Sequence, residues 1–299
     1  MYLEHFGFKE FPFSITPDTE FFFSSDGSLE ALNTLLIAVK TGEGFIKITG
    51  EVGTGKSMLC RKLISSLSQD YQVAYIPNPY LDPDSLFREI ASELGLEFNT
   101  TSVERYHLLR SINEKLFSLH SRGQRVVVCL DEAQAMPIET LEALRLLSNL
   151  ETEKRKLLQV IIFGQPELEE KLNHPSIRQL KQRIAFEYHL SPMGRYEIDY
   201  YLQHRLMIAG YRGSRLFSNH ALWLLKRRTH CVPRLVNIIA HKSLLSAYGK
   251  GHRNISFWHV LKATNDTASI ARPTSLSRYT ALILILCFGV LLIKRGYFL

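Results

Sequence analysis

Residues 50–57 read Gly50-Glu51-Val52-Gly53-Thr54-Gly55-Lys56-Ser57 and fit G-x-x-x-x-G-K-[ST], the pattern of a phosphate-binding P-loop. An apolar run, residues 44–49, leads into the pattern, and a helical pattern, residues 58–64, follows it. A strand, a glycine loop and a helix in this order are the context in which the pattern forms a site. The segment therefore predicts a site for the phosphates of a nucleotide.

The residue types of this segment suit a triphosphate. Glycines let the backbone turn its N–H groups toward phosphate oxygens, and the start of the next helix adds partial positive charge. Lys56 can reach the β- and γ-phosphates, and the Ser57 hydroxyl can ligate Mg²⁺. The predicted ATP-binding residues are Gly50, Glu51, Val52, Gly53, Thr54, Gly55, Lys56, Ser57 and Met58.

A second nucleotide signature follows the continuous apolar run of residues 125–130, which suits a parallel strand buried on both faces. The run ends in Asp131-Glu132-Ala133-Gln134. Asp131 is placed to hold Mg²⁺, and Glu132 to orient and deprotonate the attacking water. The alternative, a solvated acidic pair at a strand end, is disfavoured because a P-loop lies upstream.

A third strand, residues 157–163, brings Gln165 to its carboxyl end, where a doubly wound sheet places its site. An amide there could contact the γ-phosphate or the water, or it could be an ordinary turn residue. A short strand, residues 73–76, is predicted between the P-loop strand and the strand that ends at Asp131. This inserted strand, together with a glutamate beside the Mg²⁺ aspartate, favours an ATPase that activates water with its own base. It fits kinases and Ras-like GTPases less well.

Helices alone are expected after Pro192, and the chain divides accordingly. The predicted helices span residues 196–209, 219–229, 233–248 and 257–264, and one before the P-loop is predicted to start at a Ser28 cap. The predicted parts are an aromatic N-terminal arm (1–27), a P-loop αβα domain (28–192), a helical lid (193–268), a linker (269–278) and a transmembrane anchor (279–299). The rings of the arm could fill a core or could close over the nucleotide base.

Charge is divided unevenly along the chain. Residues 1–200 contain 21 Lys/Arg and 28 Asp/Glu, whereas residues 201–299 contain 15 Lys/Arg and one acid, Asp266. A basic half indicates an anionic partner, either nucleic acid or a membrane surface. The four cysteines include no C-x-x-C pair, which argues against a disulfide framework and a zinc site.

The end of the chain predicts a membrane anchor. Residues 279–293 carry no charge, and Lys294, Arg295 and Tyr297 follow as residues suited to the interface. Fifteen helical residues span about 22 Å, so the flanking residues are needed to cross a core of about 30 Å. The positive-inside rule puts the basic lid in the cytoplasm and predicts a single-pass inner-membrane protein. A buried core helix is the alternative.

Together these motifs resemble the secretion-type AAA+ ATPases, the family of general secretion pathway protein A. The resemblance covers residues 1–268 and includes an N-terminal Phe6-Gly7-Phe8, residues 163–168, residues 179–184 and Val232-Pro233-Arg234. It implies an α/β fold, an AAA+ P-loop NTPase with an αβα parallel sheet and a C-terminal helical lid. One departure is Cys231, where the family often has glycine. Because the chain ends six residues after Ile293, a cell-wall-binding domain of the kind found in general secretion protein A is not expected.

The resemblance also implies roles for particular side chains. Gln165 corresponds to the sensor on the fourth strand and Arg234 to the sensor of the lid. Arg183 corresponds to an arginine finger given in trans to a neighbouring subunit, with Arg178 as a weaker candidate. A finger in trans implies a homo-oligomer, and its charge offsets the charge that develops in the transition state.

The function that these features favour is a membrane-tethered AAA+ ATPase that uses ATP and Mg²⁺. It would serve inner-membrane proteins that assemble a type IV pilus or a type II secretion-like complex, next to an anionic membrane surface. Two alternatives remain: a DNA-binding, transposition-type AAA+ ATPase and a nucleotide-gated scaffold with slow hydrolysis. Nucleic acid is not the expected partner because no base-reading element stands out, and a helicase is excluded because no second RecA-like domain follows.

Overall fold

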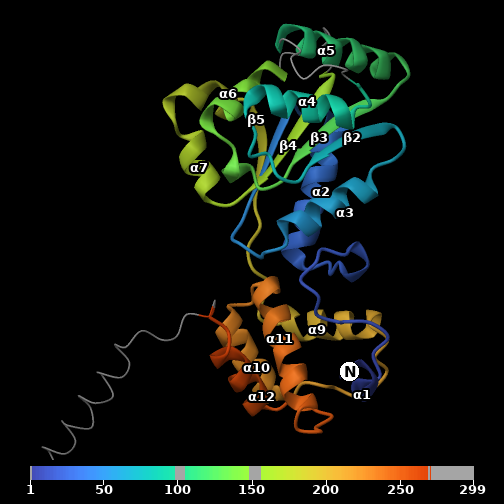
Figure 1. The fold of residues 1–299 in the computed structure, drawn as a ribbon, viewed down its shortest axis with the longest axis vertical. Helices are drawn as coiled ribbons and strands as arrows, with labels where there is room; N and C mark the ends of the chain where they lie inside the picture. The colour runs from blue at the N-terminus through green and yellow to red at the C-terminus, as the bar shows by residue number, and fades with distance from the viewer. Residues whose placement is uncertain (1, 98–104, 148–155, 269, 271–299) are drawn as a thin grey trace, which may run out of the picture.

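The computed structural model describes residues 2–97, 105–147, 156–268 and 270. Figure 1 shows two parts: an α/β part that contains a five-stranded sheet, and a helical part beyond the carboxyl ends of its strands. The N-terminus lies in the helical part, beside helices from the end of the chain. The chain therefore begins next to the predicted lid, enters the α/β part, and returns.

The sheet has the order β2-β3-β4-β1-β5, and every strand pair is parallel. Its strands are β1 (Phe45–Thr49), β2 (Tyr71–Ile76), β3 (Arg125–Leu130), β4 (Leu158–Gly164) and β5 (Ile184–His189). The central strand β4 is buried along its whole length, as expected of an apolar run in a parallel sheet covered on both faces. Because all strands are parallel, the residues that follow β1, β3 and β4 lie at one edge of the sheet.

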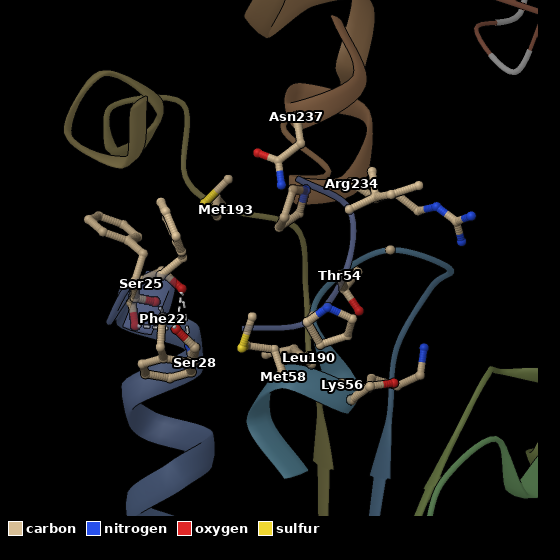
Figure 2. Close-up of a pocket in the computed structure, with 18 of the residues that line it drawn as sticks. Phe22, Ser25, Ser28, Thr54, Lys56, Met58, Leu190, Met193, Arg234 and Asn237 are labelled. Carbon is tan, nitrogen blue, oxygen red and sulfur yellow. Dashed lines mark hydrogen bonds between the residues drawn. The ribbon is translucent and has the colours of Figure 1, made fainter. Parts of the chain in front are cut away.

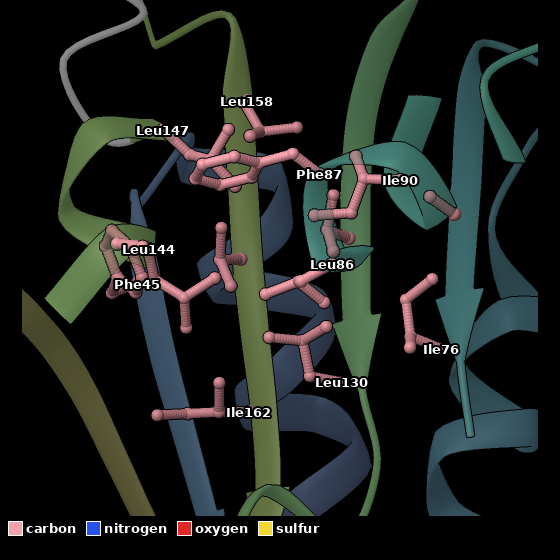
Figure 3. Packing of buried hydrophobic residues seen from close by; sticks show 14 of the residues in the cluster. Phe45, Ile76, Leu86, Phe87, Ile90, Leu130, Leu144, Leu147, Leu158 and Ile162 are labelled. Carbon is pink, nitrogen blue, oxygen red and sulfur yellow. The ribbon is translucent and has the colours of Figure 1, made fainter. Parts of the chain in front are cut away.

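Helices cover both faces of the sheet. On one face, α2 (Asp26–Thr41) and α3 (Lys56–Ser66) share a core with residues of β1, β3 and β4. The other face carries α4 (Pro83–Glu93), α5 (Arg105–Ser121), α6 (Ile138–Leu147), α7 (Glu167–Leu172) and α8 (Arg178–Lys181). Figure 3 shows the core of this second face, where leucines, isoleucines and Phe87 from α4 and α6 pack over Phe45, Leu130, Leu158 and Ile162.

Helix α2 begins earlier than the sequence predicted. The Ser25 side chain, not that of Ser28, caps the helix by accepting a hydrogen bond from the Ser28 N–H. Ser28 instead lies in the first turn, where its hydroxyl donates to the carbonyl oxygen of Phe23 at 3.2 Å. Both serines precede an apolar periodic pattern, so only the backbone geometry distinguishes the cap.

The helical part contains α9 (Glu197–Ile208), α10 (Asn219–Thr229), α11 (Pro233–Tyr248) and α12 (Phe257–Asn265), close to the predicted bounds. Its core includes N-terminal aromatic residues, namely Tyr2, Phe6, Phe8, Phe13 and Phe21. The N-terminal segment also contains regular structure, namely α1 (Tyr2–Phe6) and a 3-10 turn (Thr19–Phe21). These rings therefore complete the core of the helical part.

Strand β5 was not expected from the sequence. It is an outermost strand of the sheet, and its residues alternate between half-buried and exposed positions, so it has no continuous apolar run. The predicted anchor, residues 279–299, and nearly all of the predicted linker, residues 269–278, lie outside the described residues. Among the described helices, none has both the length and the apolar composition needed to cross a membrane.

Candidate nucleotide-binding site

The P-loop connects β1 to α3 at the carboxyl edge of the sheet. Gly53 and Gly55 have φ angles of +84° and +108°, a backbone region that residues with a Cβ rarely adopt. Gly55 is the N-cap of α3, and no side chain caps this helix. The first N–H groups of α3 are thus available to an anion, and the partial charge at the helix start favours one.

Lys56 bends back over this loop. Its ammonium donates to the carbonyl oxygens of Gly50, at 2.7 Å, and Glu51, at 3.0 Å, and the residue is only 5% exposed. Burial lowers the pKa of Lys56, while the negative charges of Glu132 and Asp131 raise it. The lysine therefore lies close to both carboxylates that follow β3, as a shared triphosphate site requires.

Asp131 follows β3 and is 3% exposed. Burial raises the pKa of its carboxyl, whereas hydrogen bonds from Ser57 and from the Glu132 N–H lower it. The Tyr75 hydroxyl lies 3.5 Å from Asp131 Oδ2. Burial is the main cause that raises the pKa of Tyr75 to about 12, and the negative charge of Asp131 adds to it. The Ser57 hydroxyl and the Asp131 carboxylate are thus neighbouring oxygen donors, the ligand type that Mg²⁺ prefers.

Glu132 is held by two amides. Its Oε2 accepts hydrogen bonds from Gln165 Nε2, at 3.0 Å, and from Gln134 Nε2. Gln134 Oε1 in turn accepts from the Gln165 N–H at 2.9 Å, so the three side chains form one network. Glu132 also has a φ of +52°, which is uncommon for a residue with a side chain. The backbone turn and the two amides together fix the direction of this carboxylate.

The helical part contacts the P-loop directly. The Arg234 N–H, in the first turn of α11, donates to the Gly53 carbonyl oxygen at 3.2 Å. A Cβ built on Gly53 would lie 2.6 Å from the Cβ of Arg234, so only glycine permits this approach. Pro233 has no N–H, so the N–H that reaches the loop comes from the next residue, Arg234, and the Val232 side chain also lies close to Gly53.

A pocket with a cavity volume of about 370 Å³ lies between the P-loop and the helical part. Figure 2 shows the Arg234 and Lys56 side chains on one side of the pocket, and Phe22, Ser25 and Ser28 on the other. Side chains of Met58, Leu190, Met193 and Asn237 lie between them. The cationic side suits phosphates, and the remainder, with apolar side chains and a few polar groups, suits a base and ribose.

The structure distributes the predicted residues over three places. The pocket is lined by residues 52–58, Glu132 and Arg234. Asp131 lies beside Ser57, and Gln165 contacts Glu132, so both lie at the same carboxyl ends of the strands. Arg183 does not join them, because it precedes β5 and so lies at the opposite edge of the parallel sheet. Arg178, at the start of α8, is likewise absent from the pocket lining.

Several residues at the site had no predicted role. Gln134 was part of a quoted motif, but nothing in the sequence indicated that its amide would bind Glu132. Arg205, Tyr201 and Asn237 line the pocket from helices α9 and α11, and residues 14–17 line it from the N-terminal segment. The aromatic and proline content of the N-terminus was the one available signal, since it suggested a segment that closes over the base.

Comparison with known proteins agrees with this architecture. Residues 39–172 match a family model described as an AAA domain. Over 297 residues the chain is 36% identical to General secretion pathway protein A of Aeromonas hydrophila, a match that covers 99% of this chain and 53% of the relative. The chain thus spans about half the length of that curated relative.

Solved structures share the fold. Cdc6p from Pyrobaculum aerophilum aligns with a TM-score of 0.66 at 22% identity, over 83% of this chain and 70% of that chain. The Walker-type ATPase of Pyrococcus abyssi aligns with a TM-score of 0.59 at 16% identity, over 95% of this chain and 80% of that chain. The family-model match and these structures show that the chain has an AAA-type P-loop fold. Within it, the sequence is similar to the secretion pathway protein.

Proposed function

We propose that this protein is a membrane-tethered AAA+ ATPase of the secretion-protein-A type, which hydrolyses ATP to ADP and phosphate. The observation that supports this most strongly is that Lys56, Asp131 and Glu132 meet at one sheet edge, beneath Arg234 of the helical part. A triphosphate held by the P-loop would lie among a cation, a carboxylate that can hold a metal ion, and a carboxylate that can act as a base.

In the proposed reaction, Glu132 accepts a proton from a water in line with the bond between the β- and γ-phosphates. The water oxygen forms a bond to the γ-phosphorus, and ADP leaves with the electron pair. The amides of Gln134 and Gln165 orient Glu132, and Gln165 can turn from Glu132 toward the γ-phosphate. Lys56 and the lid residue Arg234 neutralise phosphate charge.

Mg²⁺ fits the donor set at this site. Ser57 and Asp131 offer a hydroxyl and a carboxylate oxygen, and oxygen is the ligand type that Mg²⁺ prefers. When bound between Ser57 and Asp131, Mg²⁺ would supply positive charge that offsets the charge of the phosphates. The Ser57 hydroxyl lies near the Asp131 carboxylate and, against the larger effect of burial, lowers the pKa of that carboxyl, so the two oxygen donors are adjacent.

We further propose that Arg183 is an arginine finger that acts on a neighbouring subunit in a homo-oligomer. Its place before β5, at the edge of the sheet opposite the P-loop, supports action in trans because it cannot serve the site of its own chain. Arg183→Ala should keep ATP binding and lose turnover by roughly 10³-fold. Phosphate release should return when this variant is mixed with Lys56→Ala, which supplies an intact finger.

Arg178→Ala is the matched control for that measurement, because it removes an exposed arginine five positions earlier. It should retain turnover. Full activity of Arg183→Ala, or no recovery in the mixture, would contradict the role of Arg183.

The cellular role that we propose is the assembly of a type IV pilus or a type II secretion-like complex, with inner-membrane assembly proteins as partners. The similarity to General secretion pathway protein A supports this role. As the particular system we propose the mannose-sensitive haemagglutinin (MSHA) type IV pilus, whose biogenesis ATPase, protein M, the motifs of residues 1–268 resemble. The charge-free run of residues 279–293 supports a single-pass inner-membrane tether with the ATPase part in the cytoplasm, against an anionic membrane surface.

Fractionation followed by an ATPase assay tests tether and activity together. The full chain should remain in the membrane fraction after alkaline carbonate extraction and release phosphate from ATP only with Mg²⁺. The same chain without residues 279–299 should be soluble and still bind ATP. A full chain that fractionates as soluble would refute the tether. ATP binding without turnover, with lipid and partner proteins present, would favour the nucleotide-gated scaffold.

A further inference from the structure

Arg205 of α9 is a buried arginine at the nucleotide pocket, with 4% of its surface exposed. Its Nε donates to the Pro12 carbonyl oxygen at 2.6 Å, and its Nη2 donates to the Ser14 carbonyl oxygen at 3.3 Å. Both acceptors belong to the N-terminal segment, whereas Arg205 belongs to the helical part. One guanidinium therefore joins two distant pieces of chain beside the pocket.

The remaining contacts of Arg205 extend this connection to a third element. Its guanidinium lies over the Phe21 ring, at 4.7 Å, and its Nη1 donates to the Tyr201 hydroxyl at 3.2 Å. The Tyr201 hydroxyl donates to Asn237 Oδ1 at 2.8 Å, and Asn237 Nδ2 lies 3.4 Å from the Ser14 carbonyl oxygen. The N-terminal segment, α9 and α11 thus share one closed network.

Every hydrogen-bond acceptor of this cation in the described part of the chain is neutral. Burying a charge without a counter-ion is unfavourable, so carbonyl oxygens and aromatic faces must replace the water that Arg205 has lost. Residues 10–17 form no regular helix or strand, so few backbone hydrogen bonds of their own hold them in place. Arg205 and Asn237 hold this segment at Pro12 and Ser14, and Arg61 Nη1 donates to the Pro17 carbonyl oxygen at 3.0 Å.

The segment that Arg205 holds forms part of the pocket wall. Residues 14–17, Phe22, Tyr201, Arg205 and Asn237 line the same pocket as Lys56, the residue that would hold the phosphates. The length of a nucleotide then places its base and ribose among these residues and the side chains of Met58, Leu190 and Met193. The base would contact residues that Arg205 positions.

We propose that Arg205 is a positioning residue for the nucleobase: by binding the carbonyl oxygens of Pro12 and Ser14 it fixes the start of the wall that residues 14–17 form, and it joins that wall to the lid. This inference rests on the proposed function only in assuming that a nucleoside triphosphate occupies the pocket. Its consequence is selective. Loss of the Arg205 contacts weakens binding of the base and leaves binding of the triphosphate group unchanged, because the P-loop contacts do not involve Arg205.

The test compares ATP with inorganic tripolyphosphate, which has the phosphates and lacks the base. Arg205→Lys in the full chain keeps the charge but cannot bond two carbonyl oxygens and a hydroxyl in one plane. We expect ATP binding to weaken about tenfold, the effect of one or two lost charge-assisted hydrogen bonds, and tripolyphosphate binding to stay unchanged. The KM for ATP should rise, with kcat at saturating ATP preserved.

Two further variants make the result decisive. Tyr201→Phe removes only the hydroxyl at the centre of the network and should give the same selective loss on a smaller scale, even if Arg205→Lys fails to fold. Arg215→Lys, an exposed arginine paired with Asp199 on α9, should change neither affinity. An equal loss for both ligands, or no loss for either, in folded variants overturns the proposal.

The same measurements separate this proposal from the proposed function. Wild-type protein that binds ATP but never hydrolyses it would refute the ATPase and leave the Arg205 comparison valid. Wild-type protein that binds neither ATP nor tripolyphosphate would overturn both.

Discussion

Lys56→Ala is expected to abolish nucleotide binding, with an affinity for ATP at least about 100-fold below that of the wild type, or roughly 2.7 kcal/mol. The buried ammonium faces the negative charges of Glu132 and Asp131. Without it, a triphosphate would enter a site that holds two carboxylates and no central cation, so repulsion would oppose binding. Titration with a fluorescent ATP analogue in the presence of Mg²⁺ measures the loss.

The matched control is Lys40→Ala, which removes the same charge from an exposed position near the end of α2. It should bind ATP as the wild type does. Thermal unfolding of both variants checks that the fold persists, which matters because the lysine also holds two loop carbonyl oxygens. If folded Lys56→Ala protein bound ATP normally, the triphosphate would not lie on this loop.

Glu132→Gln is expected to bind ATP with unchanged affinity and to lose turnover by about 10²–10⁴-fold, the usual contribution of a general base. The substitution preserves size and leaves one oxygen that can still accept from the amides of Gln134 and Gln165, so the local structure should persist. An amide cannot take the proton of the attacking water. Single-turnover phosphate release, measured beside the ATP dissociation constant, separates chemistry from binding.

Glu139→Gln, a change of the same kind at an exposed acid in the first turn of α6, should behave as the wild type. Normal turnover of Glu132→Gln would show that another group activates the water. A parallel loss of ATP binding would instead assign Glu132 to holding the nucleotide.

Much of the secondary structure could be predicted because its signals are local. The apolar run of β3 and the bounds of α10 and α11 agree with the structure, since period and capping act over a few residues. Strand β5 was missed because an edge strand with alternating exposure gives a weak signal. The cap of α2 was misplaced by three residues, from Ser25 to Ser28, because two serines offered the same side chain.

The candidate site was predictable only in part, because only some of its residues are set by local sequence signals. Lys56, Ser57, Asp131 and Glu132 follow from strand ends and motif spacing, because parallel strands bring their carboxyl ends to one edge. The position of Gln134 in the network with Gln165 depends on the backbone turn at Glu132, whose φ of +52° no motif specifies.

The order of strands β1 to β4 and of the helices after Pro192, and the candidate groups for phosphate and metal, follow from the sequence alone, because backbone dihedral preferences and side-chain periodicity act between near neighbours. Only the tertiary structure decided that N-terminal aromatic rings complete the core of the helical part and that Arg205 binds carbonyl oxygens of residues 12 and 14. Contacts between residues nearly two hundred positions apart depend on how the whole chain packs, and no local pattern encodes them.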